Sequence, residues 1–201
     1  GEPLSDSPHT GYQRLALGES LVVMDTGNPP AGELSGLAHA GCLSFEFSSR
    51  TSCIVVNCGV PLFSREGMPP VWRNTAAHST ATLCDTSSCK FESLHSELEQ
   101  PDGLVLTPNL RVECRRNDTT DASVVTASHL GYERQFGVRH QRTLVLDEDG
   151  NRLRGNDWFS APDKSDLRYS AHDQVTVRFH LHPNIIVSRD PTVDNAYLLT
   201  T

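Results

Sequence analysis

The sequence predicts an all-β fold, an antiparallel β-sandwich, from two observations. Apolar and polar residues alternate along much of the chain, whereas helical periodicity is hard to find. Loops rich in Gly, Pro, Asp and Ser separate the alternating runs. Roughly a dozen short strands with frequent turns are typical of a sandwich. One domain over residues 1–201 is the simplest division, and only 93–100 resembles a helix.

The first strands are expected in "YQRLALGESLVVMDTG" (12–27), as a pair about the turn at Gly18-Glu19. The next run, "CLSFEFSS" (42–49), alternates strictly. One face of this strand carries Leu43, Phe45 and Phe47, and the other carries Ser44, Glu46 and Ser48. The run "IVVNCG" (54–59) ends another strand at Asn57. An exposed position for Glu46 is the commoner explanation, although it could also serve as a general acid.

Two further strand pairs are expected in "LVLTPNLRVECRR" (104–116) and "HQRTLVLDEDGNRLRG" (140–155). The second pair turns at Asp149-Gly150, a strong hairpin dipeptide. The run "DQVTVRFHLHP" (173–183) alternates and ends at a proline. We therefore predict stacked sheets over residues 12–182. Their shared core should include Leu43, Phe45, Val55, Val177 and Phe179.

Composition excludes several classes of function. Hydrophobic residues make up 37% of the chain and charged residues 21%, which is typical of a folded domain. The 17 basic and 25 acidic residues give a net charge of −8, which argues against nucleic acid as a partner. No apolar run approaches the roughly 20 residues that span a membrane. The chain starts at Gly1 and stops in the strand-like "AYLLTT", so we expect a piece of a longer protein, truncated at its C-terminal end.

Neither the cysteine spacings nor the two histidines of one strand match a known type of metal site well. Two C-x4-C spacings, at Cys53/Cys58 and Cys84/Cys89, do not match zinc knuckles, so buried thiols are expected. His180 and His182 could belong to a cupin-type metal site, but the residues after them lack its Glu and Gly. Solvent-facing histidines are therefore the preferred interpretation. No G-x-S-x-G elbow or phosphate-binding glycine loop is present.

A more specific pattern joins His39, Asn57 and His78. Both histidines are flanked by small residues and followed by hydroxyl residues, and Asn57 ends a strand between them. Two imidazoles and one oxygen ligand on neighbouring strands would suit zinc. These three residues are the candidate metal ligands.

Three segments in this order resemble the C-terminal β-sandwich of heparinase II/III-like polysaccharide lyases. The segments are "AHAGCLSFEF" (38–47), "IVVNCG" (54–59) and "RNTAAHSTATLCD" (73–85). The resemblance implies a supersandwich-like fold, excised from a bacterial parent with an N-terminal α-helical toroid against which it packs. It also implies a periplasmic location, with the cytoplasm left open.

The resemblance implies that the parent cleaves an acidic, uronate-containing polysaccharide by β-elimination. The tyrosine that handles the proton lies on the toroid in this family, so the isolated chain should be inactive and should carry no catalytic residue. A second reading is a non-catalytic structural or carbohydrate-binding module. By resemblance, His39 and His78 correspond to zinc ligands and Asn57 to an acidic ligand. Leu37 and Gly41 stand where the family has a His and an Asp.

Overall fold

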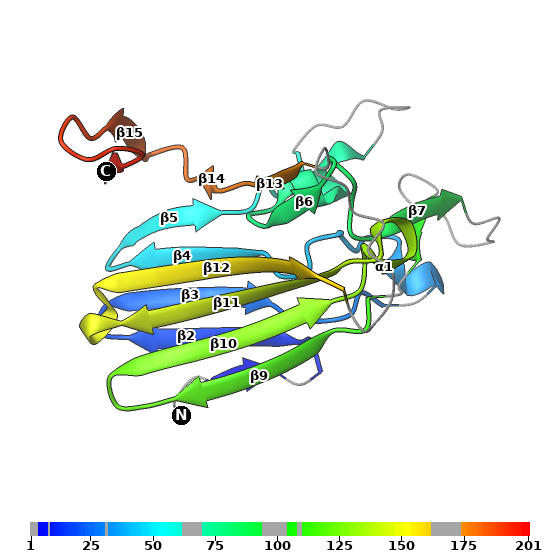
Figure 1. Cartoon of the computed structure of the whole chain (residues 1–201), viewed down its shortest axis with the longest axis horizontal. Helices are drawn as coiled ribbons and strands as arrows, with labels where there is room; N and C mark the ends of the chain where they lie inside the picture. Colours follow the sequence, from blue (N-terminus) through cyan, green and yellow to red (C-terminus); the bar gives the residue numbers. More distant parts are fainter. Residues whose placement is uncertain are drawn as a thin grey trace.

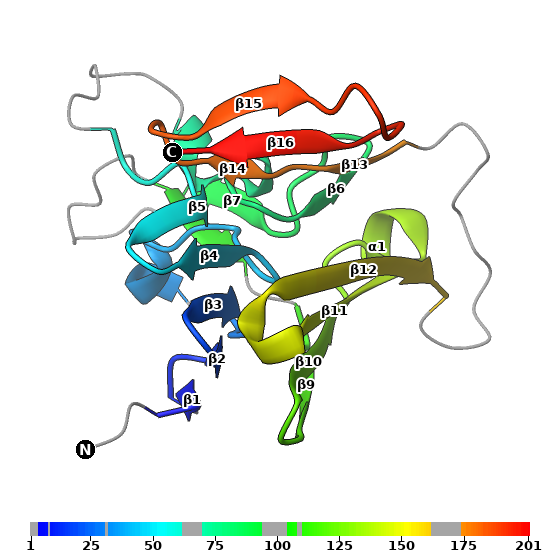
Figure 2. The same ribbon diagram turned by 90° about the vertical axis from the view of Figure 1, so that its left-hand side faces the viewer.

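The computed structural model describes residues 4–7, 9–30, 32–61, 70–93, 104–107, 110–161 and 174–201. Antiparallel sheets dominate these residues, which confirms the predicted all-β sandwich. Figure 1 shows the two larger sheets lying over one another, and Figure 2 shows them from the end. The predicted single domain over 1–201 stays a prediction.

The first sheet has six strands in the order β1-β2-β3-β4-β5-β14. Their bounds are Asp6–Ser7 for β1, Tyr12–Leu17 for β2, Ser20–Asp25 for β3, Phe45–Ser49 for β4, Ser52–Val56 for β5 and His180–Leu181 for β14. The predicted hairpin is confirmed, because Leu17 pairs with Ser20 across Gly18-Glu19. Gly18 is needed there: its φ is +55°, and a Cβ would lie 2.1 Å from the Asp149 carbonyl oxygen.

The second sheet has four strands in the order β12-β11-β10-β9. Their bounds are Glu113–Asp118 for β9, Ala122–His129 for β10, Arg139–Asp147 for β11 and Arg152–Ser160 for β12. The predicted hairpin near Asp149-Gly150 is confirmed, with Asp147 pairing with Arg152 across a 3-10 turn at Glu148–Gly150.

Three two-stranded sheets complete the strands of the described part of the chain. They pair β6 (Ala81–Leu83) with β13 (Val175–Val177), β7 (Lys90–Ser93) with β8 (Leu104–Thr107), and β15 (Ile186–Arg189) with β16 (Tyr197–Thr200). One short helix, α1 (Glu133–Phe136), and 3-10 turns at Gly32–Ser35, Val71–Arg73 and Thr75–Ala77 lie between strands. Figure 2 shows the β15–β16 hairpin on the β14 side of the first sheet. Leu199 of β16 lines a cavity together with Leu144 and Leu153 of the second sheet.

The main core lies between the two larger sheets. Leu15, Val22 and Met24 from the first sheet pack in the same cluster as Leu144 and Leu146 from the second. Burial of such side chains supplies the main favourable term in folding, at about 25 cal/mol per Å² of apolar surface. A smaller cluster around Tyr132 and Leu83 lies beside α1.

A buried arginine ties the second sheet to the loops around the candidate site. Arg142 on β11 is only 1% exposed, and its guanidinium donates to the carbonyl oxygens of Leu43 and Ser79, each at 2.9 Å. Leu43 precedes β4 and Ser79 follows His78. This contact fixes the two loops that carry the candidate histidines.

The predicted core is right for three residues and wrong for two. Leu43, Phe45 and Val55 are buried, but Val177 is 39% exposed and Phe179 is 57% exposed. The reason is a break in the strand, because β13 pairs with β6 whereas β14 pairs with β5. Alternation carried across this break no longer tells which side chains point inward.

Two other sequence predictions need correction. The run 104–116 does contain two strands, but β8 pairs with β7 and β9 with β10, so they do not form a hairpin with each other. Buried thiols are found only at Cys42 and Cys89. The other four cysteines, Cys53, Cys58, Cys84 and Cys114, are exposed. Of the helix-like run 93–100, Ser93 ends β7 and residues 94–100 lie outside the described residues.

Candidate functional site: a polar cleft on the outer face of the first sheet

The floor of the site is a row of polar side chains across neighbouring strands. Tyr12 on β2 pairs directly with Asp25 on β3, and Val23 on β3 pairs with Glu46 on β4. The alternate residues Val22, Met24 and Phe45 point into the core. Because successive strand residues point to opposite faces, Tyr12, Asp25 and Glu46 face outward together.

Loops before β4 and β6 turn this row into a cleft of about 470 Å³. The two candidate histidines stand in its wall. The cleft is lined by Thr10, Tyr12, Val23, Asp25, Gly27, Asn28, Pro29, Pro30, Leu37, Ala38, His39, Gly41, Cys42, Ser44, Glu46, Asn57, Gly59 and His78. This volume falls within the range of small-ligand sites.

His39 and His78 are in direct contact. His39 Nδ1 lies 3.1 Å from His78 Nε2, and the rings meet edge to face with centroids 5.2 Å apart. The backbone carbonyl of Asn74 lies 2.8 Å from His78 Nδ1 and can only accept, so this nitrogen carries the proton. His78 Nε2 is therefore the acceptor, and His39 Nδ1 donates to it.

Both imidazoles are neutral at pH 7. Burial lowers the pKa of His78 to about 4, an effect that the Asn74 carbonyl partly opposes. Burial also lowers the pKa of His39, and the nearby Arg73 guanidinium lowers it further. The pair therefore acts through hydrogen bonding rather than through positive charge.

Gly41 makes the position of His78 possible. A Cβ built on Gly41 would lie 2.9 Å from His78 Cδ2, closer than a carbon–carbon contact allows. The imidazole thus packs directly on the backbone at a position where the resembled family has an Asp. His78 can therefore occupy its observed position only because residue 41 has no side chain.

Both ends of the Asn57 side chain are engaged. Its Oδ1 accepts a hydrogen bond from the Ser79 backbone N–H at 2.8 Å, and its Nδ2 donates to Glu46 Oε1 at 3.2 Å. Because an N–H must face an oxygen, the Ser79 contact fixes the orientation of the amide. Asn57 therefore joins the end of β5 to the segment that follows His78.

The cleft carries negative charge. Burial raises the pKa of Asp25 to about 6, although the Gly27 N–H opposes the shift, so this carboxyl is mostly ionised at pH 7. The charge of Asp25, then burial, then the charge of Glu46 raise the pKa of Tyr12. Of the described residues that line the cleft, none is Lys or Arg.

Of the three candidate zinc ligands, the structure brings two into contact. His39 and His78 meet, while the Asn57 amide is bonded to Ser79 and Glu46. Within the described ranges, no group of three His, Cys, Asp or Glu side chains could hold a metal ion. The two imidazoles lie close enough to each other to share a zinc ion, whereas both ends of the Asn57 amide are already hydrogen-bonded. Zinc at His39, Asn57 and His78 stays a prediction.

Sequence reasoning missed two members of the cleft and misplaced one histidine. Tyr12 and Asp25 could have been found by pairing residues across the predicted turn at Gly18-Glu19, which places them opposite one another. His180, expected to face solvent, is half-buried and hydrogen-bonded to Cys58 and Ala76. Glu46 is exposed, as its strand position indicated.

Comparison with known proteins points to one family. The family described as heparinase II/III-like, C-terminal, has a model that matches residues 1–201. A solved heparinase III structure (the BT4657 gene product) superposes with a TM-score of 0.59 at 15% identity, over 94% of this chain and 25% of that chain. The heparan sulfate lyase HepC of Pedobacter heparinus gives a TM-score of 0.49 at 19% identity, over 74% of this chain and 20% of that chain.

A curated relative is more similar in sequence. FtsZ-localized protein C of Caulobacter vibrioides is 30% identical over 190 residues, which is 90% of this chain. The chain spans 31% of the length of that relative. No helix in the described part of the chain is long and apolar enough to cross a membrane.

Proposed function

Because the chain belongs to the heparinase II/III-like C-terminal family, a family of polysaccharide-lyase-related domains, we propose that its cleft binds a glycan without cleaving it. The glycan would be one without carboxylate groups. The observation that carries this proposal is the pair of carboxylates, Asp25 and Glu46, in a cleft whose described lining has no Lys or Arg.

The chemistry of β-elimination explains why this charge matters. A base removes the C5 proton of a uronate, and that proton becomes acidic enough only when the neighbouring carboxylate is neutralised by cations or hydrogen-bond donors. Asp25 and Glu46 would instead repel a uronate. His39 and His78 are neutral and add no compensating charge.

The same side chains suit a glycan rich in hydroxyl groups. Carboxylates accept hydrogen bonds from hydroxyls, and Tyr12 is 47% exposed, so its ring is available to a sugar face. The contacts of Asn57 with Ser79 and Glu46 hold the floor in place before a ligand binds. Such preorganisation lowers the cost of binding.

Calorimetric titration of the chain with uncharged and uronate oligosaccharides tests the proposal. We expect binding of an uncharged oligosaccharide, weakened about tenfold by Asp25→Asn or Glu46→Gln, as for the loss of one charged hydrogen bond. Glu19→Gln is the matched control, since Glu19 is exposed in the β2–β3 turn, outside the cleft lining. Tighter binding of uronates, or equal affinities in all three variants, would contradict the proposal.

Cleavage of a uronate polysaccharide by β-elimination is the rival function, and the family match supports it. The test is incubation of the full-length protein with uronate polymers while the ultraviolet absorbance of the unsaturated product is followed. Product formation that is lost in His39→Ala would establish a lyase and overturn the non-catalytic proposal. The chain of residues 1–201 alone should form no product under either function.

The similarity to FtsZ-localized protein C supports a second proposal, on location. We propose that the protein containing this chain is recruited to FtsZ, because the 30% identity extends over 90% of the chain. A fluorescent fusion of the full-length protein should coincide with labelled FtsZ in cells of its own organism. A fusion that stays uniformly distributed where FtsZ is assembled would refute this proposal.

A further inference from the structure

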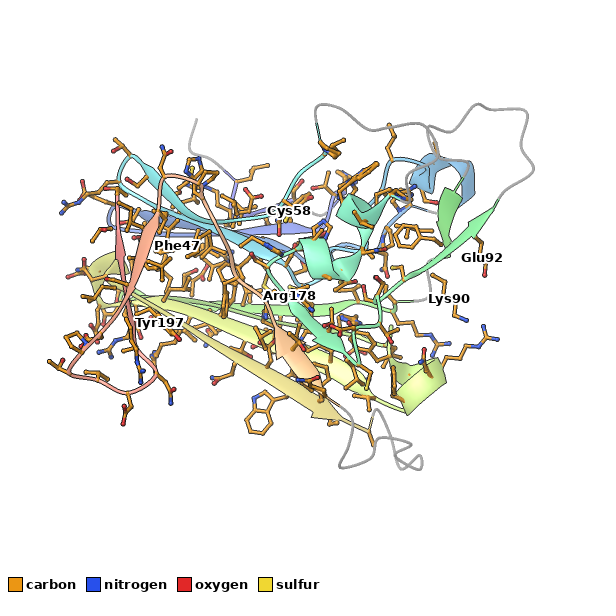
Figure 3. The ribbon with its side chains drawn as sticks, turned by 90° about the horizontal axis from the view of Figure 1, so that it is seen from above. Phe47, Cys58, Lys90, Glu92, Arg178 and Tyr197 are labelled. Carbon is orange, nitrogen blue, oxygen red and sulfur yellow. The ribbon has the colours of Figure 1, made fainter. Side chains whose placement is uncertain are left out.

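A cysteine and a histidine form a hydrogen-bonded pair outside the set of residues that line the cleft. Cys58 follows Asn57, and its side chain is exposed. Its Sγ lies 3.3 Å from His180 Nδ1 on β14, within the reach of a sulfur hydrogen bond. Figure 3 labels Cys58 in the segment that follows β5.

The contact with Ala76 decides which atom donates. His180 Nε2 lies 3.0 Å from the Ala76 carbonyl oxygen, which can only accept. The ring proton therefore sits on Nε2, and Nδ1 presents a lone pair to the sulfur. The Cys58 thiol donates its hydrogen to His180 Nδ1, so a nucleophile faces a base that a third group orients.

The backbone holds both partners in place. The Cys58 N–H donates to the Ala77 carbonyl at 3.0 Å, so one 3-10 turn, Thr75–Ala77, anchors the cysteine through Ala77 and the histidine through Ala76. The His180 N–H donates to Ser79 Oγ at 2.9 Å, and His180 pairs with Val56 between β14 and β5. The pair is therefore built into the fold.

We propose that Cys58 and His180 form a nucleophilic thiol site that undergoes exchange with low-molecular-weight disulfides. The Cys58 sulfur attacks one sulfur of the disulfide while its proton moves to His180 Nδ1. A new S–S bond forms at Cys58 and the S–S bond of the reagent breaks. The departing thiolate takes the proton from His180, so a mixed disulfide and one free thiol result, and no other oxidant is needed.

The geometry accommodates the proton on either partner. An imidazolium has two N–H donors, and here Nε2–H already faces the Ala76 oxygen while Nδ1–H would face the sulfur. Burial raises the pKa of the Cys58 thiol, so the resting sulfur carries its proton. The proton therefore moves during attack, and the histidine is needed for the rate.

The test is timed reaction of the folded chain with the neutral reagent dithiodipyridine, with mass spectrometry to locate the modified cysteine. Cys53 is an internal reference, because it is exposed on β5 and makes no hydrogen bond through its side chain in the described structure. We expect Cys58 to react about tenfold or more faster than Cys53, as for assistance by a general base.

Replacing the base separates its role from simple exposure. His180→Gln should reduce the rate at Cys58 to that at Cys53 while leaving Cys53 unchanged, and Cys58→Ser should remove the fast phase. Continued protection of the buried Cys42 and Cys89 from the reagent shows that the variant is folded. If His180→Gln unfolds the chain, the order of the two rates in the unaltered chain decides alone. Cys58 reacting no faster than Cys53, or equally fast in folded His180→Gln, would overturn the proposal.

Discussion

The buried charge pair of the second sheet gives the most quantitative prediction. Asp157 on β12 accepts two hydrogen bonds from Arg142, at 2.8 and 2.9 Å, and one from His140 at 2.7 Å. The side chains of Arg142 and Asp157 are 2% and 16% exposed. Replacing Asp157 by Asn keeps the shape but removes the negative charge, and it turns an amide NH2 group toward a guanidinium that cannot accept.

The magnitude follows from the uncompensated charge that remains. Breaking a buried ion pair by removing one partner costs about 3–5 kcal/mol. For a chain of this length, a loss of that size lowers the melting temperature by roughly 10 °C. Arg142 also donates to the carbonyls of Leu43 and Ser79, so the loss should loosen the loops around the cleft as well.

Denaturant and thermal unfolding followed by circular dichroism would measure the effect. The matched control is Glu19→Gln, which removes the exposed Arg50–Glu19 ion pair, whose side chains are 77% and 69% exposed. Exposed pairs contribute at most about 1 kcal/mol. If Asp157→Asn lowers the free energy of unfolding no more than this control does, the assigned role of the buried pair is wrong.

The pH dependence gives a second check on the same pair. Burial alone would raise the pKa of Asp157, but the hydrogen bonds from His140 and Arg142 lower it to about 2. Since the folded pKa lies below the unfolded value, the contribution of about 2 kcal/mol is complete above about pH 5 and is lost as the pH falls toward 2. The stability difference between the unaltered chain and Asp157→Asn should shrink over that window.

Three further predictions concern the cleft. Gly41→Ala should displace the His78 ring, break its contact with His39 and cost about 1–3 kcal/mol, as for overpacking; unchanged imidazole NMR signals would contradict this. Asp25→Asn should be as stable as the unaltered chain near pH 4 and more stable near pH 7–8. The reason is that the folded pKa of Asp25 is raised to about 6, so the unaltered chain loses stability as the pH rises through that value. Equal pH profiles of the free energy of unfolding would refute this prediction. Asn57→Asp should raise the affinity for zinc, because a carboxylate partly offsets the charge of the cation. Calorimetry measures the affinity, with the double variant Asn57→Asp/His78→Ala as control. If Asn57→Asp binds zinc no more tightly than the unaltered chain, the site has lost more than one charge.

Most strands could be predicted because local signals agree with long-range pairing. At Gly18-Glu19 and at Asp149-Gly150, two alternating runs flank a short turn, so each strand pairs with the next strand along the chain. The local sequence is therefore enough to predict the partner of each strand. Residues 175–181 have the same alternation but switch partners between Val177 and His180. Which sheet a strand joins depends on residues far away in the sequence, so the local alternation pattern cannot predict it.

The sequence predicted which histidines belong to the candidate site, but it could not predict the hydrogen bonds that Asn57 makes there. The sequence singled out His39 and His78, and the structure brings their rings into contact. It could not show that the Asn57 amide bonds to Ser79 and Glu46, because that depends on the register of β5 relative to the segment after His78. Tyr12 and Asp25 join the cleft only through the pairing of β2 with β3.

Four of the described histidines form two imidazole pairs, and both pairs have the same physical role, which residue type alone does not reveal. His129 Nδ1 accepts from the Gly131 N–H, so its Nε2–H faces His140, whose Nε2–H in turn faces Asp157. His39 and His78 repeat this head-to-tail arrangement in the cleft. In both pairs burial lowers the pKa, which keeps the rings neutral and lets each donate with one nitrogen and accept with the other. Because each ring of such a pair is already hydrogen-bonded to its partner, His39 and His78 alone are weak evidence for the zinc that the family resemblance predicts. The carboxylate that should accompany it is the stronger sign, and position 57 lacks it.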